Sequence, residues 1–547
     1  MSTPVDFHLE TRRWGAPAGL TVVAVELREV VSAVGGASVT LAAEPGAALP
    51  FDAGEVLGEP ATLAFDAAGA RCFHGIVTAA RVEVREGVAS CALELAPRLW
   101  RASRSRRSRA FLELSVHDIV RRVLAENGLG DDDFVWRCAS PIPPRPYVVQ
   151  YEESDLDFLQ RTLEREGVFY YVDHAGGRDR VVFGDHNNAF APLDEAGASV
   201  GFAPHGGGLD GFTGAREWAH VARLQPRAVA VRDYRPHAPR VVMNTRLAPV
   251  MDDRWTVAES GLQSHYGDHV ASDEDAARAA RLRAELLRCG ADRYEGVTQV
   301  SAVRAGASFA LHNHPEASFD REYVVLRATH RYVLDRGLGS SANKGAPRYD
   351  NLVEALPREV PFRPERATPR PVMPPWIPAV VADVDARQRK EAEVTSPLDE
   401  LGRYRVVFPF DTAVVEGGAT SCPVPLAPSF AGEGFGEHAP LHRGTHVLVG
   451  HVHGDPDRPV IVAALMPSVV KHPTSRGERL TRGGVREDYD DHAPAWKAQP
   501  RRKRATTTSD RIDGVVSLAG RAIEKDRENR PAGPLRAAPN ADRTKKE

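Results

Sequence analysis

Alternation of apolar and polar residues, repeated in short runs, constrains this chain more strongly than any other feature of its sequence. Three such runs are LTVVAVELREV (20–30), CFHGIVTAARVEV (72–84) and ASCALELAP (89–97), with Gly, Pro and Asp between them. Side chains two positions apart lie on the same face of a β-strand, so each run predicts a strand with one buried face. Residues 1–95 are therefore expected to form a small antiparallel sheet or barrel.

A helical period replaces this alternation in places between residues 96 and 205, which predicts an α/β segment there. Residues 115–127 carry one apolar stripe behind a serine N-cap, as expected for a helix. Ser154 and Asp157 have the S-x-x-D spacing of a second helix start, and Gly167 is expected to end that helix. The strand VFYYV follows at once.

The rest of the chain divides by composition into four segments. Residues 206–330 are expected to be a second strand-rich region around one helix, and residues 331–375 a Pro-rich linker. Residues 376–466 are expected to form an OB-type barrel of five or so short strands, and residues 467–547 a basic tail. Within the tail we expect a short stub to about residue 491 and a flexible end beyond about residue 495. The predicted fold class is mainly β with some α.

Composition excludes several classes of protein. The 547 residues are 42% hydrophobic with a formal net charge of -4, which argues against a nucleic-acid-binding protein. No window approaches the roughly 18 apolar residues of a membrane helix. The start has no apolar h-region, so no conventional secretion signal is expected. Five scattered cysteines without CxxC spacing favour a reducing compartment and no disulfide framework.

Residues 150–174 are rich in carboxylates, and paired carboxylates are common in hydrolase sites. The carboxylates are Glu152, Glu153, Asp155, Asp157, Glu164 and Glu166. Most have a simpler role, because the aspartates lie in the first helical turn and Glu164 is spaced to pair with Arg161 on the exposed side. We therefore favour a structural role, and no catalytic residues or cofactor are predicted.

Two histidine-containing segments and one predicted turn are candidates for metal, nuclease or structural sites. His451 and His453 are expected on one strand face and are weak candidates for metal ligands, against a polar barrel face without metal. The adjacent letters HNH at 312–314 are a loop sequence rather than a nuclease unit. The string GDPDRP predicts a structural corner in which Arg458 pairs with a neighbouring aspartate. Its residues are Gly454, Asp455, Pro456, Asp457, Arg458 and Pro459.

Four segments in order resemble the VgrG family, the spike proteins of bacterial type VI secretion, which are similar to the hub and needle proteins of phage T4. They are the Q-Y-x-E-S-D helix–strand pattern, the strand DREYVVLRATH (320–330), the strand GRYRVVF (402–408) and the GDPDRP corner. The first pattern is carried by Gln150, Tyr151, Glu153, Ser154, Asp155, Phe158, Arg161, Glu164, Glu166, Gly167, Tyr170 and Tyr171.

The resemblance implies two hub β-barrels, the inserted α/β segment and an OB-fold spike base, assembled as a homotrimer. The implied partners are an Hcp-like tube, a baseplate and a PAAR-type tip or effector cargo, with no nucleic acid and a membrane only as the punctured target. It also implies assembly in the bacterial cytoplasm and ejection without a signal peptide. This sequence departs from the family in lacking a long needle repeat. Two alternatives remain: a spike of another contractile particle, and a spike that carries an enzyme.

Overall fold

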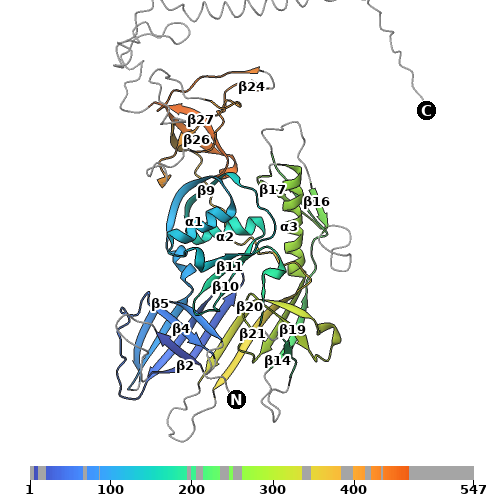
Figure 1. Cartoon of the computed structure of the whole chain (residues 1–547). Coiled ribbons are helices and arrows are strands. Elements are labelled where there is room, and N and C mark those ends of the chain that lie inside the picture. Colours follow the sequence, from blue (N-terminus) through green and yellow to red (C-terminus); the bar gives the residue numbers. More distant parts are fainter. Residues whose placement is uncertain are drawn as a thin grey trace, which may run out of the picture. The chain divides into compact units, whose positions relative to one another are not determined.

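The computed structural model describes thirteen stretches of the chain, whose helices and strands are drawn in Figure 1. They are residues 5–9, 20–65, 71–85, 87–193, 199–204, 214–234, 246–249, 261–270, 272–334, 347–382, 398–412, 421–432 and 435–466. The predictions for the tail, residues 467–547, lie outside the described residues. No helix in the described part of the chain is both long enough and apolar enough to cross a membrane.

One large sheet joins the two strand-rich regions that the sequence separates. Ten of its strands form one path, and three short strands attach beside it, which gives 13 strands. In path order the ten are β1 (Asp6–Leu9), β4 (Pro60–Ala64), β5 (Cys72–Arg85), β6 (Val88–Ala96), β3 (Gly36–Ala43), β2 (Leu20–Val30), β20 (Glu322–Val333), β21 (Arg348–Pro357), β18 (Asp292–Thr298) and β14 (Ala215–Ala222). The three short strands are β12 (Ala191–Pro192), β13 (Ser199–Gly201) and β19 (Ala307–His312).

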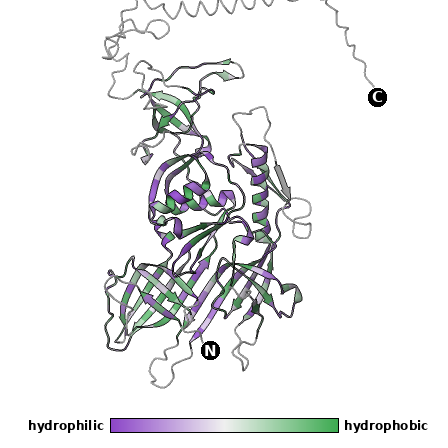
Figure 2. Cartoon of the chain, viewed as in Figure 1, coloured by the Kyte–Doolittle hydropathy of each residue, from purple (hydrophilic) through white to green (hydrophobic). Residues whose placement is uncertain are grey.

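The pairing of β2 with β20 links the first region to the second. It is antiparallel, with Ala24 opposite Val333 and Val30 opposite Arg327. The alternation of hydropathy along these strands is visible in Figure 2. Apolar side chains on the buried faces form separate clusters in the first and second regions. The sequence therefore predicted the strands well and did not predict that one sheet would join them.

The expectation of a linker without secondary structure is wrong for β21, which lies inside residues 331–375. This strand pairs with both β20 and β18, so it is an interior strand of the large sheet. Its burial alternates from Arg348 to Ala355, but its hydropathy does not follow, because the buried Asn351 is polar and the apolar Leu352 is exposed. The sequence therefore lacks the apolar–polar alternation that predicts a half-buried strand. The Pro-rich residues that follow, 358–376, have no regular secondary structure.

The α/β segment forms as predicted, with helices α1 (Val116–Glu126) and α2 (Asp155–Glu166). Helix α1 begins at its Ser115 N-cap. The two helices pack with strands in one apolar core. The strands of this segment are β7 (Arg106–Leu114) with β9 (Arg145–Ser154), and β10 (Phe169–Asp173) with β11 (Arg180–Gly184) and β8 (Phe134–Trp136).

The helix expected in residues 206–330 is α3 (Asp273–Ala291), whose N-cap Ser272 accepts a hydrogen bond from the backbone N–H of Asp275 at 3.1 Å. Its apolar face packs on β15 (Ala228–Arg232), where Val229, Val231, Ala280 and Ala284 share one core. That strand lies between β16 (Arg246–Pro249) and β17 (Leu262–Tyr266).

The last described block contains a four-stranded sheet. Its order is β23 (Val406–Val407), β22 (Ile377–Val381), β26 (His446–His451) and β27 (Pro459–Leu465). A short hairpin, β24 (Ala431–Gly432) with β25 (Phe435–Gly436), is separate from it. The strand expected at GRYRVVF (402–408) is thus shortened to two residues. The OB-type barrel stays a prediction.

Candidate functional site

The carboxylate-rich stretch belongs to a unit that we call the helix–strand unit, residues Arg145–Asp173, made of β9, α2 and β10. Ser154 caps α2, because its Oγ accepts a hydrogen bond from the backbone N–H of Asp157 at 3.0 Å. Gly167 ends the helix in the left-handed conformation, with φ of 71°. Both terminal residues therefore act as the sequence predicts.

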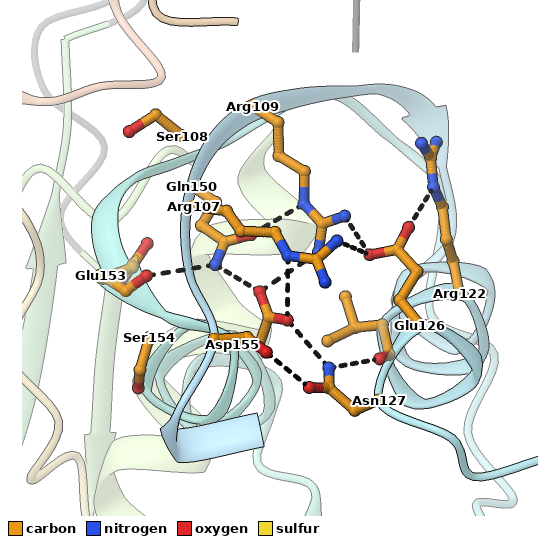
Figure 3. Close-up of polar contacts among 12 residues, drawn as sticks. Arg107, Ser108, Arg109, Arg122, Glu126, Asn127, Gln150, Glu153, Ser154 and Asp155 are labelled. Carbon is orange, nitrogen blue, oxygen red and sulfur yellow. Dashed lines mark hydrogen bonds and ion pairs between the residues drawn. The ribbon is translucent and has the colours of Figure 1, made fainter. Parts of the chain in front are cut away.

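Asp155 is fully buried at the centre of the polar network in Figure 3. Its Oδ1 accepts from Gln150 Nε2 at 2.8 Å, and its Oδ2 accepts from Asn127 Nδ2 at 2.8 Å. Arg107 and Arg109 approach the two oxygens at 3.5 and 3.4 Å. A carboxylate saturated in this way holds elements together, since it has no free oxygen positioned for proton transfer to a substrate.

The same network extends to α1 through Glu126. This carboxylate accepts from Arg107 at 2.8 Å and from Arg122 at 3.1 Å, and it also contacts Arg109 closely. Burial alone would raise the pKa of Glu126, but the three guanidinium groups hold it below its ordinary value. Strands β7 and β9 and helices α1 and α2 are therefore joined by charged hydrogen bonds as well as by apolar packing.

Arg161 connects the helix–strand unit to the corner, Gly454–Pro459. Its guanidinium donates to both oxygens of Glu153, at 2.7 and 2.6 Å, and to the carbonyl of Val149 at 2.6 Å. The N–H of the same Val149 donates to Asp457 Oδ1 at 2.7 Å. The expected surface pair of Arg161 with Glu164 is wrong, because Arg161 is directed to the buried Glu153.

The remaining residues of the motif are packing and charge partners. Tyr151 makes an edge contact with Phe410, with ring centroids 5.3 Å apart, and buried Phe158 stacks on Phe111 at 5.1 Å. Glu166 accepts from Arg145 and lies 2.7 Å from Arg278. Burial would raise the pKa of Glu166, but the arginines lower it to about 2.

Glu164 is held by the chain that follows β21. Its carboxylate accepts from the backbone N–H of Thr368 at 3.1 Å and from the Thr368 hydroxyl at 2.6 Å. Burial raises the pKa of Glu164. This carboxylate therefore anchors the extended segment to α2, a role that the sequence did not indicate.

The corner is a tight turn, as expected, and Gly454 enters it with φ of 70°. Asp455 folds back on the backbone, because its Oδ1 accepts from the N–H of Asp457 at 3.1 Å. The predicted pair of Arg458 with Asp455 or Asp457 is wrong: the Arg458 guanidinium pairs with Asp233. The physical reason is that both corner carboxylates already have other partners.

Those partners come from distant segments. Asp455 contacts His269 Nε2 closely and Arg370 at 3.1 Å, while Asp457 accepts from the β9 backbone. Sequence reasoning missed Asp233, His269 and Arg370, because no local spacing relates residues that lie 85 to 225 positions away. The corner is thus the meeting point of four separate stretches of chain.

The predicted metal candidates do not form one ligand set. His451 ends β26, but His453 lies in a turn with φ of 57°, so the two side chains do not share a strand face as expected. His451 is partly buried, and that burial lowers its pKa to about 4. His453 contacts the edge of Tyr266 at 5.7 Å. The Asn313 loop, φ 64°, is likewise a turn between β19 and β20.

A different group, His269 with Asp455 and Asp457, has ligand atoms within 4.8 Å of one another. Its geometry suits hydrogen bonding to the imidazole better than a metal, and burial lowers the pKa of His269. The Nε2 of His269 faces Asp455 and its Nδ1 lies 3.7 Å from Asp457, so the two carboxylates approach opposite ring nitrogens. Arg370 also supplies positive charge to Asp455. A single metal ion would need both carboxylates on the same side of one ring nitrogen.

Comparisons with known proteins agree with this architecture. The family model of the phage tail baseplate hub (GPD) matches residues 28–335. The type VI secretion system spike protein VgrG1c of Pseudomonas aeruginosa is 29% identical over 443 residues, 80% of this chain and 59% of the relative. The actin cross-linking toxin VgrG1 of Vibrio cholerae is 28% identical over 76% of this chain and 37% of the relative. The chain thus spans less than two thirds of the length of these relatives.

Solved structures show the same fold. One is the E. coli c3393 protein, described as a type VI secretion component with structural similarity to the T4 bacteriophage tail proteins gp27 and gp5. It has a TM-score of 0.57 at 20% identity, and the match covers 84% of this chain and 99% of that one. A chain of the half-lidded Francisella PdpA–VgrG complex has a TM-score of 0.54 at 10% identity, over 86% of this chain and 78% of that one. The resemblance to VgrG proteins is therefore confirmed, and because the hub model matches more than half of its 547 residues, the chain belongs to the phage tail baseplate hub family.

Proposed function

We propose that this protein is a structural spike of a type VI secretion system, acting as the hub and the base of the needle. The observation that carries the proposal is the way the corner is tied to the hub. Asp457 binds the backbone of β9, Arg458 pairs with Asp233, and His269 contacts Asp455. Buried charged contacts between distant segments resist relative movement of those segments, which suits a part that transmits force.

The proposal includes a homotrimer whose OB-type barrel begins the spike. Large apolar side chains are exposed in the single chain near the last block, which supports burial against further copies. They are Val372, Trp376, Leu401, Phe430 and Phe435. The trimer would sit on an Hcp-like tube and a baseplate, and contraction of a sheath would drive it out of the cytoplasm into a target cell.

We further propose that the protein works without catalysis and without a cofactor, and that it carries effectors at its C-terminal end, capped by a PAAR-type tip. The Francisella relative, solved as a complex with PdpA, supports binding of a further protein. The motif carboxylates Asp155, Glu153 and Glu166 are engaged by arginines, which supports a structural role.

Two other functions are kept as alternatives, because named relatives favour them. One is a spike that carries an enzyme, as the name of the Vibrio cholerae toxin suggests for that protein. The other is a spike of another contractile particle, such as a phage tail. The deciding experiment is deletion of the gene in its native bacterium. Loss of secretion of the tube protein, restored by the wild-type chain, supports a type VI spike, and continued secretion contradicts it.

A further inference from the structure

A cavity of about 170 Å³ lies between α2, α3 and the extended segment after β21, and arginines dominate its walls. The six lining arginines are Arg145, Arg161, Arg165, Arg283, Arg366 and Arg370. A single water takes about 30 Å³ in the liquid, so the cavity has room for a larger polar group. Arginine side chains present several N–H donors in a fixed plane, which suits carboxylate and phosphate groups.

Two carboxylates near the cavity, Glu166 and Asp268, each have more than one arginine partner. Glu166 is contacted by Arg145, lies 2.7 Å from Arg278, and lies 4.0 Å from Arg165. Its partners therefore outnumber the single negative charge that it supplies.

Asp268 is shared in the same way. Arg283 lies 2.7 Å from it and Arg366 lies 3.4 Å from it. Five guanidinium groups thus depend on the two carboxylates Glu166 and Asp268. Around these two carboxylates, guanidinium groups therefore outnumber carboxylate groups.

Two carboxylates, Asp457 and Glu164, also lie on the cavity wall, against six arginines. Asp457 accepts from the backbone of Val149, and its negative charge opposes the lowering of the pKa of Arg165. Glu164 accepts from Thr368, and burial raises its pKa.

Two of these arginines have a lowered pKa, whereas at Arg161 the effect of burial is outweighed by Glu153, which raises the pKa. Burial first and then repulsion from Arg145 lower the pKa of Arg165 to about 9. Burial and the neighbouring Arg283 lower the pKa of Arg366 to about 10, although Asp268 opposes the shift. An added negative charge would relieve this repulsion.

We propose that the arginine-lined cavity binds a phosphate-type or carboxylate oxyanion, held by Arg165, Arg366 and Arg370. The oxyanion would be a free ion, or an acidic group supplied by a second copy of this chain. The inference rests on the charge and cavity of one chain and does not depend on the proposed function.

The first experiment titrates inorganic phosphate into the full-length protein by calorimetry at constant ionic strength. A free-ion site predicts saturable binding that Arg366→Gln weakens by about tenfold or more, since one charged hydrogen bond is worth that much. The matched control is Arg121→Gln, which removes an exposed arginine paired with exposed Asp131 and is expected to bind phosphate like the wild type.

The second experiment measures particle mass by light scattering for the same three proteins. If an acidic group of another copy occupies the cavity, phosphate does not bind the assembled particle, but Arg366→Gln lowers its mass and Arg121→Gln does not. If Arg366→Gln does not fold, Arg370→Gln replaces it, because Arg370 is 41% exposed and carries less of the packing. The proposal is overturned if phosphate does not bind the wild type and the cavity variant keeps the wild-type mass, or if the control variant behaves as the cavity variant does.

Discussion

Arg458 lies 225 residues after Asp233, yet the two side chains form an ion pair. Asp233 is almost fully buried and also accepts from the N–H of Val270 at 2.9 Å. The ion-pair partner of Arg458 therefore lies outside the six residues of the corner motif. A buried carboxylate that loses its cation keeps the cost of burial without the compensating charge.

Arg458→Ala is accordingly expected to lower the free energy of unfolding by about 1 to 3 kcal/mol. Urea denaturation of the full-length protein measures this change, and Asp233→Asn with the double variant completes a mutant cycle. The control is Arg121→Ala, whose exposed pair with Asp131 is expected to contribute less than about 1 kcal/mol. Equal effects of Arg458→Ala and Arg121→Ala would show that the corner pair is no stronger than a surface pair.

Glu166 makes stability depend on pH. Its pKa in the folded protein is about 2, below the ordinary 4.5, because the surrounding arginines outweigh burial. The unfolded chain therefore takes up the proton first as the pH falls. The contribution of Glu166 to stability is complete above about pH 4.5 and is lost as the pH falls toward about 2.

We expect the free energy of unfolding to fall with pH across that window, and Glu166→Gln to make the fall shallower. Unfolding in urea at a series of pH values measures the slope. Glu83→Gln is the control, since Glu83 is half-exposed in a pair with exposed Arg81. An unchanged slope in Glu166→Gln would assign the acid sensitivity to other groups.

At the scale of elements, the end of α2 is fixed by Gly167. A Cβ there would lie 2.7 Å from Leu282 Cδ2 on α3, and the positive φ of 71° disfavours a side chain. Gly128 after α1 has a similar φ of 80°, but the atom nearest to its Cβ position is 3.4 Å away. The two glycines share a backbone conformation and differ in the space around them.

Gly167→Ala is therefore expected to destabilise the protein more than Gly128→Ala. The shared conformational cost is about 1 kcal/mol, and the contact with Leu282 adds to it in the first variant only. Thermal unfolding of the two variants side by side measures the difference. Equal losses would mean that Leu282 moves aside at no cost.

Elements with local signals were predictable from the sequence. Helix α2 has its cap, its apolar stripe and its terminal glycine within fourteen residues, Ser154 to Gly167, and it formed as expected. Strand β21 lacks apolar–polar alternation in its sequence because it buries the polar Asn351 and exposes the apolar Leu352, so it was mistaken for linker. The local periodicity of the sequence predicts a helix or a strand. It does not predict which other elements pack or pair with it, because those lie far away in the sequence.

The candidate site was predictable in the same limited way. The motif residues and the corner were found, and the caps and the turn were correct. The partners Asp233, His269 and Arg370 were not found, because each comes from a stretch without a motif of its own. Residues that form a long-range ion pair have no fixed separation in the sequence, so a spacing pattern cannot identify them.

At the scale of the whole molecule, the proposed trimer leads to a measurable mass. Among the described residues, the ten-strand path of the large sheet ends in the edge strands β1 and β14, and edge strands favour association. Light scattering at micromolar concentration is expected to give three times the 59.5 kDa chain mass. A stable particle of one chain mass would contradict the homotrimer.

The last prediction concerns residues 467–547, which lie outside the described residues and are argued from sequence alone. From residue 497 onward the sequence is basic and rich in Pro, with few large apolar side chains, so it offers little surface to offset the ordering entropy of about 1 to 2 kcal/mol per residue. We expect a protease to cut first near RRKR, residues 501–504. The shortened chains are then expected to remain a trimer. Deletion of residues 496–547 is expected to abolish effector delivery while the tube protein is still secreted, because the segment DRIDGVVSLAGRAIEKD (510–526) would recruit the cargo as a docking helix. Delivery that persists after the deletion would exclude this recruiting role, and a particle that falls apart would place the segment in the spike itself.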